Sequence, residues 1–226
     1  TATISIRGET TSLGGRHLRA PTHGARVSLF LIVALPFLSA LLPGLMNQAG
    51  RAACAGVTFT VTLAALVGLF TNLHTIIAGD VVMYRVDWIP SLGLNFTLML
   101  DALGFFFATL ILGIGLLIIA YARFYLARED NMGEFFTYLL LFQGAMVGIV
   151  LSDNILLLLV FWELTSLSSF LLIGYWKHLP EGRQGARMAL TVTGMGGLAM
   201  IGGMLILGQI AGSYDLSVIL QNRELI

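Results

Sequence analysis

The stretch NILLLLVFWELTSLSSFLLIGYW, residues 154–176, decides the fold class of this chain. It is apolar and about as long as the roughly 20 residues that a helix needs to cross the hydrocarbon core of a bilayer. Glu163 nonetheless lies near its middle, where a charged side chain costs about 2.5–3.5 kcal/mol on insertion scales. The segment therefore indicates a membrane-spanning helix whose acid needs an explanation.

The composition of the whole chain agrees with a membrane protein. Of 226 residues, 57% are hydrophobic and only 11% charged, whereas soluble domains carry about 25% charged residues. The formal net charge is zero, which favours no nucleic-acid or acidic partner. A single cysteine, Cys54, excludes an internal disulfide and a cysteine-built zinc or iron–sulfur site. His17, His23 and His74 show no metal-ligand spacing, so we expect no metal or cofactor.

The apolar runs predict an all-α polytopic fold with six transmembrane helices. We expect them at about 27–45, 52–73, 101–122, 135–152, 154–176 and 186–211. Between the second and third, VDWI, PSLG and LNFTLML read as strand, turn and strand, so a short β-hairpin is expected on one membrane face. Pro36 inside the first helix is tolerable if neighbouring groups satisfy the freed backbone.

The loop charges predict an orientation. The loops after the first, third and fifth helices hold Arg51, Arg123, Arg128, Lys177, Arg183 and Arg187, and the positive-inside rule places such loops in the cytoplasm. The polar, basic tail at 1–26 conflicts with this, because its four arginines would then lie outside. We give the three loops more weight because they agree with one another, and we read 27–45 as a first span rather than a cleaved signal.

The helix around Glu163 has two chemically different faces. On a helical wheel one side holds Leu156, Leu157, Val160, Leu164, Leu167 and Leu171, and the polar side holds Trp162, Thr165, Ser166, Ser168 and Ser169. Glu163 lies at the edge of the hydroxyl face, beside Ser166, so we expect that face to point into the bundle. Burial raises and a nearby cation lowers a carboxyl pKa, and a glutamate balanced between the two can load and release a proton. A permanently protonated Glu163 bonded to Ser166 is the alternative.

Other polar residues have simpler explanations in the sequence. Lys177, the chain's one lysine, and His178 follow the fifth helix, and Lys177 suits a positive-inside anchor better than a proton path. Asp101 suits a helix N-terminus, and Asp153 or Asn154 suits an N-cap. Gln143 could reach a water chain or bond a neighbouring helix.

Small residues recur at the spacing that lets membrane helices pack closely. The pairs are Gly144 with Gly148, Ala199 with Gly203, and Gly208 with Gly212. We interpret them as packing positions, and the glycines of GMGGLAMIGG as helical rather than as a phosphate loop.

Three stretches carry a family resemblance. FWELTSLSSFLLIGYW (161–176) resembles the fifth-helix signature of the A subunit of Mrp-type multisubunit Na⁺/H⁺ antiporters. GAMVGIVLSDNILLLLVFWE (144–163) and LMLDALGFFFATLILGIGLLIIAYARFYL (98–126) resemble the preceding segments of that family. All three also resemble the antiporter-like subunits of complex I and membrane-bound hydrogenases, although ELTSLSS favours the Mrp version. The resemblance covers roughly residues 80 to 215.

The resemblance implies a role for Glu163. In the family the matching glutamate is the fifth-helix acid of a proton channel, and its partner is a lysine on the seventh helix. The family protein is much longer than this chain, so residues 27–226 are expected to form an incomplete antiporter-like domain, either a fragment or one piece of a split subunit. The inverted repeats of such transporters need more helices than six, so antiport by this chain alone is doubtful.

The expected function is therefore a proton-translocating part of a multisubunit monovalent cation/proton antiporter in a bacterial plasma membrane, with Na⁺ favoured. Glu163 would carry the proton, Thr165, Ser166 and Ser169 would shape a hydrated path, and Trp162 would pack beside it. Asp101, Gln143, Lys177 and His178 are weaker candidates. Two alternatives remain open: a subunit of a redox-driven proton pump whose centres reside in other chains, and a structural membrane piece without an ion path.

Overall fold

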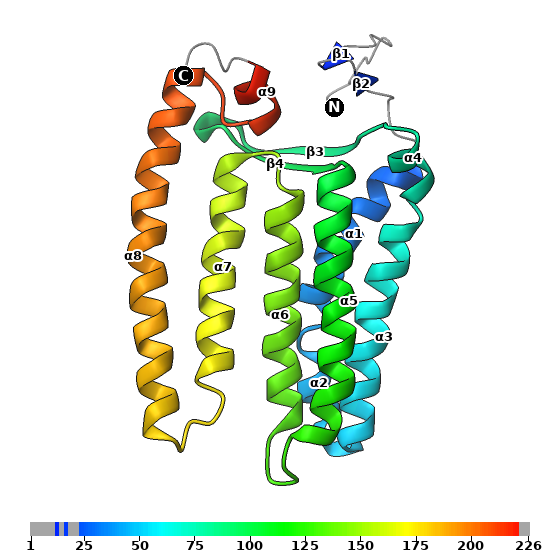
Figure 1. The fold of residues 1–226 in the computed structure, drawn as a ribbon, viewed down its shortest axis with the longest axis vertical. Helices are drawn as coiled ribbons and strands as arrows, with labels where there is room; N and C mark the ends of the chain where they lie inside the picture. The colour runs from blue at the N-terminus through cyan, green and yellow to red at the C-terminus, as the bar shows by residue number, and fades with distance from the viewer. Residues whose placement is uncertain (1–11, 14–15, 18–22, 222–226) are drawn as a thin grey trace.

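The computed structural model describes residues 12–13, 16–17 and 23–221. Six long helical segments lie side by side along the long axis of the molecule (Figure 1), and all six are long and apolar enough to cross a membrane. Their helices are α1 (His23–Ser39), α3 (Arg51–Phe70), α5 (Ala102–Tyr125), α6 (Met132–Leu151), α7 (Ile155–Ile173) and α8 (Pro180–Ala211). The predicted all-α polytopic class is confirmed.

Short elements cover the two ends of this bundle. They are β1 (Ser12–Leu13), β2 (Arg16–His17), α2 (Leu42–Leu45), η1 (Met46–Ala49), α4 (Leu73–Ile77), β3 (Val82–Ile89), η2 (Pro90–Leu92), β4 (Leu94–Leu100) and α9 (Leu216–Gln221). Strands β3 and β4 lie across one end (Figure 1), and the loops joining α5 to α6 and α7 to α8 lie at the other. Most of the predicted tail, 1–26, falls outside the described residues.

The predicted hairpin is confirmed and is longer than expected. Strands β3 and β4 pair antiparallel from Val82 with Leu100 to Ile89 with Leu94, with an irregularity between Val86 and Ile89. The turn ends at Gly93, whose φ of 69° is a left-handed conformation that favours glycine. The ring of Tyr214 packs where a side chain at this position would lie, so Gly93 is required for contact as well as for the turn.

Two helix boundaries differ from prediction because of proline. The first segment divides, since α1 ends at Ser39 and the short helix α2 follows with Pro43 in its first turn, where the missing N–H of proline leaves no helical bond unmade. The last helix begins at Pro180, six residues before the predicted start at 186. Its first turns contain Glu181, Gln184 and two arginines. Because these residues are polar, a search for apolar runs does not detect the start of the helix. Pro36 is accommodated inside α1.

Capping explains how three of the spans begin. The Asp101 carboxylate accepts from the Gly104 amide at 2.8 Å, and Asn131 accepts from the Glu134 amide. Asn154 accepts from the amides of Leu156 and Leu157 at 3.1 and 3.2 Å. These bonds satisfy helix-terminal N–H groups that have no partner within their own helix, and they confirm the N-cap interpretations of Asp101 and Asn154.

The small residues of α6 receive aromatic rings rather than another backbone. A Cβ at Gly144 would lie 2.9 Å from the Phe37 ring, and one at Gly148 would lie 2.5 Å from Cγ of Phe161. Phe37 and Phe161 stack with centroids 6.2 Å apart. The predicted packing role holds for α6. On α8, in contrast, nothing among the described residues lies within 4 Å of a Cβ built at Gly203.

Helix α8 is the least covered span. Only 6% of its apolar window is buried, against 50% for α6, and its contacts within the described chain are mainly with α7 and α9. The α7–α8 pair therefore forms an edge of the bundle (Figure 1), and this edge is where Glu163 lies.

Gly148→Ala should lower the stability of the bundle. The added methyl overlaps the Phe161 ring inside a close-packed core, and such overpacking costs about 1–3 kcal/mol. The measurement is thermal unfolding of the complete subunit in detergent. Gly113→Ala is the matched control, because no described atom lies within 4 Å of a Cβ there. Equal melting temperatures for the two variants would contradict the packing argument.

Candidate functional site: Glu163 on helix α7

Glu163 lies near the middle of α7, eight residues after its first residue, which is about 12 Å along the axis. Its carboxylate points at α8, where Oε1 occupies the space that a Cβ on Gly197 would take. The glycine thus allows the acid to lie directly against the α8 backbone. Within the described part of the chain, Glu163 makes no ion pair or side-chain hydrogen bond.

The surroundings of this carboxylate are apolar. A shallow groove along α7 and α8 contains Glu163 and is otherwise lined by Leu159, Val160, Leu164, Leu167 and Ile201. Glu163 is exposed in the chain as described, so the groove is open rather than closed over the acid. An uncompensated carboxylate beside aliphatic side chains at mid-span is stable only when it is paired, hydrated or protonated.

The hydroxyl residues of α7 bond within their own helix. The hydroxyl groups of Thr165, Ser166, Ser168 and Ser169 each donate to a backbone carbonyl one turn earlier, at 2.7 to 3.2 Å. Ser166 and Ser168 are buried, whereas Glu163 and Trp162 are exposed. The acid and the buried serines therefore face different surroundings, and no hydrogen bond joins Glu163 to Ser166 in the described structure.

Lys177 and His178 lie in the loop after α7, at the end of the bundle. Lys177 makes an ion pair with Glu134 of α6, and this hydrogen bond raises the pKa of Lys177. His178 is exposed. Neither residue is brought to Glu163, and the position of Lys177 at a helix end agrees with the predicted anchor.

Gln143 makes a helix–helix hydrogen bond. Its Oε1 accepts from the Thr62 hydroxyl of α3 at 3.1 Å, with both residues buried. Its side-chain amide occupies the space over Gly115 of α5, and Nε2 has no hydrogen-bond partner in the described structure. Of the two sequence interpretations, bonding to a neighbouring helix is thus the one the geometry supports. Asp101 and Gln143 both lie apart from the α7–α8 groove.

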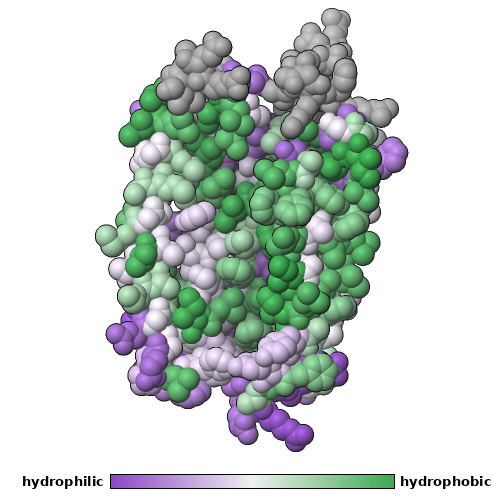
Figure 2. Space-filling model, in the orientation of Figure 1, coloured by the Kyte–Doolittle hydropathy of each residue, from purple (hydrophilic) through white to green (hydrophobic). Residues whose placement is uncertain are grey.

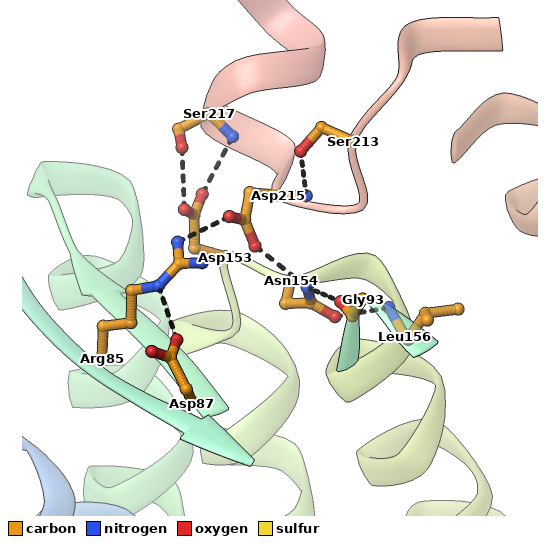
Figure 3. A network of polar contacts seen from close by, with 9 residues as sticks. All are labelled: Arg85, Asp87, Gly93, Asp153, Asn154, Leu156, Ser213, Asp215 and Ser217. Atoms are coloured by element: carbon orange, nitrogen blue, oxygen red, sulfur yellow. Dashed lines mark hydrogen bonds and ion pairs between the residues drawn. The ribbon is translucent and has the colours of Figure 1, made fainter. Parts of the chain in front are cut away.

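A second polar site joins segments that are distant in the sequence (Figure 3). Arg85 of β3 binds Asp215 at 2.7 Å, and Asn154 donates to the other oxygen of Asp215 at 2.9 Å. Asp153 accepts from the amide and the hydroxyl of Ser217 at 3.0 and 2.8 Å. Sequence reasoning did not find this network. The adjacent Asp153 and Asn154 were noted as caps, but nothing local connects them with Arg85 or Asp215.

Among residues 12–13, 16–17 and 23–221, no group of three or more His, Cys, Asp or Glu side chains is arranged to hold a metal ion. Six candidate spans and a hairpin across one end of the bundle define a polytopic membrane protein, with a carboxylate near the middle of one span.

Comparisons with known proteins agree with this class. The family model for the N-terminus of chain 5 of NADH–ubiquinone oxidoreductase (complex I) matches residues 88–136. The model for the transmembrane region of NADH:quinone oxidoreductases and Mrp antiporters matches residues 152–225. The chain therefore belongs to the family of antiporter-like membrane subunits. Within that family it resembles the A subunit of Mrp-type antiporters.

The similar relatives are antiporter subunits. The A/B subunit of a probable K⁺/H⁺ antiporter from Rhizobium meliloti is 44% identical over 95% of this chain and 22% of its own length. The A subunit of the Na⁺/H⁺ antiporter of Alkalihalophilus pseudofirmus is 40% identical over 90% of this chain and 25% of its own length. The chain thus spans about a quarter of these curated relatives.

Two solved structures have the same fold. The Mrp complex from Dietzia sp. DQ12-45-1b matches with a TM-score of 0.72 and 29% identity over 87% of this chain and 20% of that chain. An archaeal membrane-bound sulfane sulfur reductase matches with a TM-score of 0.71 over 84% of this chain and 29% of that chain, at 17% identity, which supports the fold alone.

Asp215→Asn should destabilise the hairpin end more than Asp87→Asn. Both carboxylates bind Arg85, but the Asp215 side chain is 11% exposed and that of Asp87 is 68% exposed. Losing the charge of Asp215 should cost about 1–2 kcal/mol, whereas the exposed pair contributes less than about 0.5 kcal/mol. Thermal unfolding of the two variants measures this, and an equal loss would contradict the ranking.

Asp153→Asn should change how stability depends on pH. Burial raises the pKa of Asp153 above its ordinary 3.8, and the two hydrogen bonds from Ser217 oppose the shift only partly. The folded state then holds the proton more tightly than the unfolded state, so this contribution is present at low pH and is lost as pH rises through the raised pKa. The wild type loses this contribution as pH rises and the variant cannot. The melting temperature of the variant minus that of the wild type should therefore rise with pH over that range. A constant difference would show that Asp153 does not titrate this way.

Proposed function

We propose that this chain is the proton-translocating part of a multisubunit monovalent cation/proton antiporter, with Glu163 as the proton carrier. The observation that carries the proposal is the position of Glu163, a mid-span carboxylate in an aliphatic groove with no cation bound to it in the described chain. Such a group is rarely retained for structure, because a charge at the middle of a membrane span costs free energy that no partner in the described chain offsets.

The basic residues of the described chain support this assignment. Arg51 starts α3, Arg123 lies in the last turn of α5, and Lys177 follows α7. Arg85 lies in the hairpin. All four are near the ends of the bundle, and Arg128, Arg183 and Arg187 lie in a loop or in the first turns of α8. We therefore propose that a segment or subunit beyond the described residues provides the group that exchanges charge with Glu163. The open face of α8, buried over only 6% of its window, leaves room for it.

We propose that hydroxyl groups of α7 border the proton path, of which Thr165 and Ser169 are half-buried, whereas Ser166 is buried and does not share the surroundings of Glu163. Thr165, Ser166 and Ser169 donate to carbonyls of their own helix, and each hydroxyl oxygen keeps acceptor capacity for a water molecule. In this proposal water reaches Glu163 past these groups when the groove is covered, and Trp162 borders the path. The setting is the bacterial plasma membrane, with the further antiporter subunits as partners.

The exchanged cation follows from the relatives rather than from this chain. The relatives are named for K⁺ in one case and Na⁺ in others, and the groove holds one carboxylate, which is too few oxygen ligands for a dehydrated cation. We propose that Na⁺ or K⁺ crosses elsewhere in the complex and that the described segment handles the proton.

Glu163→Gln should abolish exchange while leaving the complex assembled. The amide keeps the shape of the side chain but cannot titrate, so cation-driven proton movement should fall at least about tenfold. The assay is dye-reported pH change in vesicles that hold the complete complex, after addition of Na⁺ or K⁺. Glu163→Asp, which still titrates, should keep part of the activity.

The control for this experiment is Glu129→Gln, which removes an exposed acid from the loop between α5 and α6. It should exchange cations like the wild type. Normal exchange by Glu163→Gln in a complex of normal subunit content would refute the assignment of Glu163.

A second candidate function is a subunit of a redox-driven proton pump. It is favoured by the family description for residues 88–136, which names NADH–ubiquinone oxidoreductase. Mass spectrometry of the native complex discriminates between the two. Small antiporter subunits would support the first function, and copurifying quinone-reductase or hydrogenase subunits would support the second.

A further inference from the structure

A basic groove lies at the end of the bundle opposite the hairpin. It has a volume of about 220 Å³ and lies between α6, α7 and α8. Its lining consists of Tyr138, Phe170, Leu171, Gly174, Lys177, Arg183, Ala186 and Arg187. It is separate from the groove of Glu163, with which it shares no residue.

The charge of this groove is only partly balanced. Lys177 is paired with Glu134. Arg183 and Arg187 lie one turn apart on α8, and within the described chain neither makes an ion pair or a side-chain hydrogen bond. The first acid of α8, Glu181, is exposed and does not line the groove. Two guanidinium groups, each with five donors, therefore share one concave surface without an anion.

The position of the groove matches the edge of a membrane. Helix α7 ends at Ile173 and α8 begins at Pro180, so the groove lies where two spans meet their connecting loop. Its aromatic and aliphatic lining, Phe170 and Leu171, belongs to the last turn of α7. Figure 2 shows hydrophobic side chains along the body of the bundle and hydrophilic ones gathered at this lower end.

We propose that this groove binds an anionic phospholipid, with Arg183 and Arg187 on the headgroup phosphate and Phe170 and Leu171 against the acyl chains. Arginine binds phosphate through paired N–H donors, and basic pockets between spans on the cytoplasmic side bind lipid headgroups. The predicted orientation puts this end in the cytoplasm. A free phosphate ion would use the arginines but would gain nothing from the apolar lining. The proposal needs the chain to span a membrane with this groove open to lipid, and it does not depend on Glu163.

The test uses the complete complex, purified in mild detergent and titrated with phosphatidylglycerol under native mass spectrometry. The double variant Arg183→Gln/Arg187→Gln should bind phosphatidylglycerol about tenfold to thirtyfold more weakly than the wild type, from the loss of two headgroup cations. Arg123→Gln/Arg128→Gln removes the same charge from the same end, and neither residue lines this groove. It should bind like the wild type.

A second measurement needs no variant. Photoactivatable phosphatidylglycerol added to the wild-type complex should label the peptide that contains residues 170–187, and zwitterionic phosphatidylethanolamine carrying the same probe should label it several-fold less. The Glu163→Gln complex should be labelled like the wild type, so that a failure of the proton-carrier assignment leaves this result unchanged.

Three results would overturn the proposal. One is equal phosphatidylglycerol affinity for both double variants and the wild type. Another is displacement of the lipid signal by millimolar inorganic phosphate as effectively as by phosphatidylglycerol, which would make the groove a simple anion site. The third is absence of labelling at 170–187, which would mean that another polypeptide segment covers the groove.

Discussion

The side chain of Asn154 joins three segments at one point, and the placement of α7 depends on it. Its carbonyl oxygen accepts from the first amides of α7, and its amide donates both to the Gly93 carbonyl of the hairpin turn and to Asp215 after α8. Backbone bonds on either side strengthen the junction, from Asp153 to Thr97 and from Ile155 to Tyr214. Because α7 is a rigid helix, the angle at which it leaves this junction determines where Glu163 points, about 12 Å further along its axis.

Glycine then decides how close Glu163 comes to its neighbour. The acid lies against Gly197, and any larger residue at that position would displace it from the α8 backbone. Close packing against glycine also occurs at Gly148 and Gly208, where the rings of Phe161 and Tyr214 occupy the space that a Cβ would take. In a membrane, where lipid gives helices no hydrophobic reason to associate, such close contacts supply much of the attraction between spans.

The sequence predicted those parts of the structure that rest on local patterns. Apolar runs located the six spans, PSLG located the hairpin turn, and the isolated Glu163 in residues 154–176 indicated the candidate site. The parts it missed depend on partners that are far apart in the chain. Arg85 and Asp215 are separated by 130 residues and Asn154 and Gly93 by 61, so no window of sequence contains both partners. The wheel also placed Glu163 at the edge of a serine face expected to point into the bundle, whereas in the structure Ser166 is buried and Glu163 is exposed.

The distance between Arg85 and Asp215 along the chain has a consequence for biosynthesis. Arg85 emerges from the ribosome before α5, α6, α7 and α8 have been made, whereas Asp215 follows all four. During that interval the hairpin cannot acquire the carboxylate that binds its arginine most closely. Closure of the junction over Asn154 therefore cannot precede the synthesis of α8, because Asp215 follows that helix. The network therefore forms only in molecules in which the end of α8 has returned to the hairpin side.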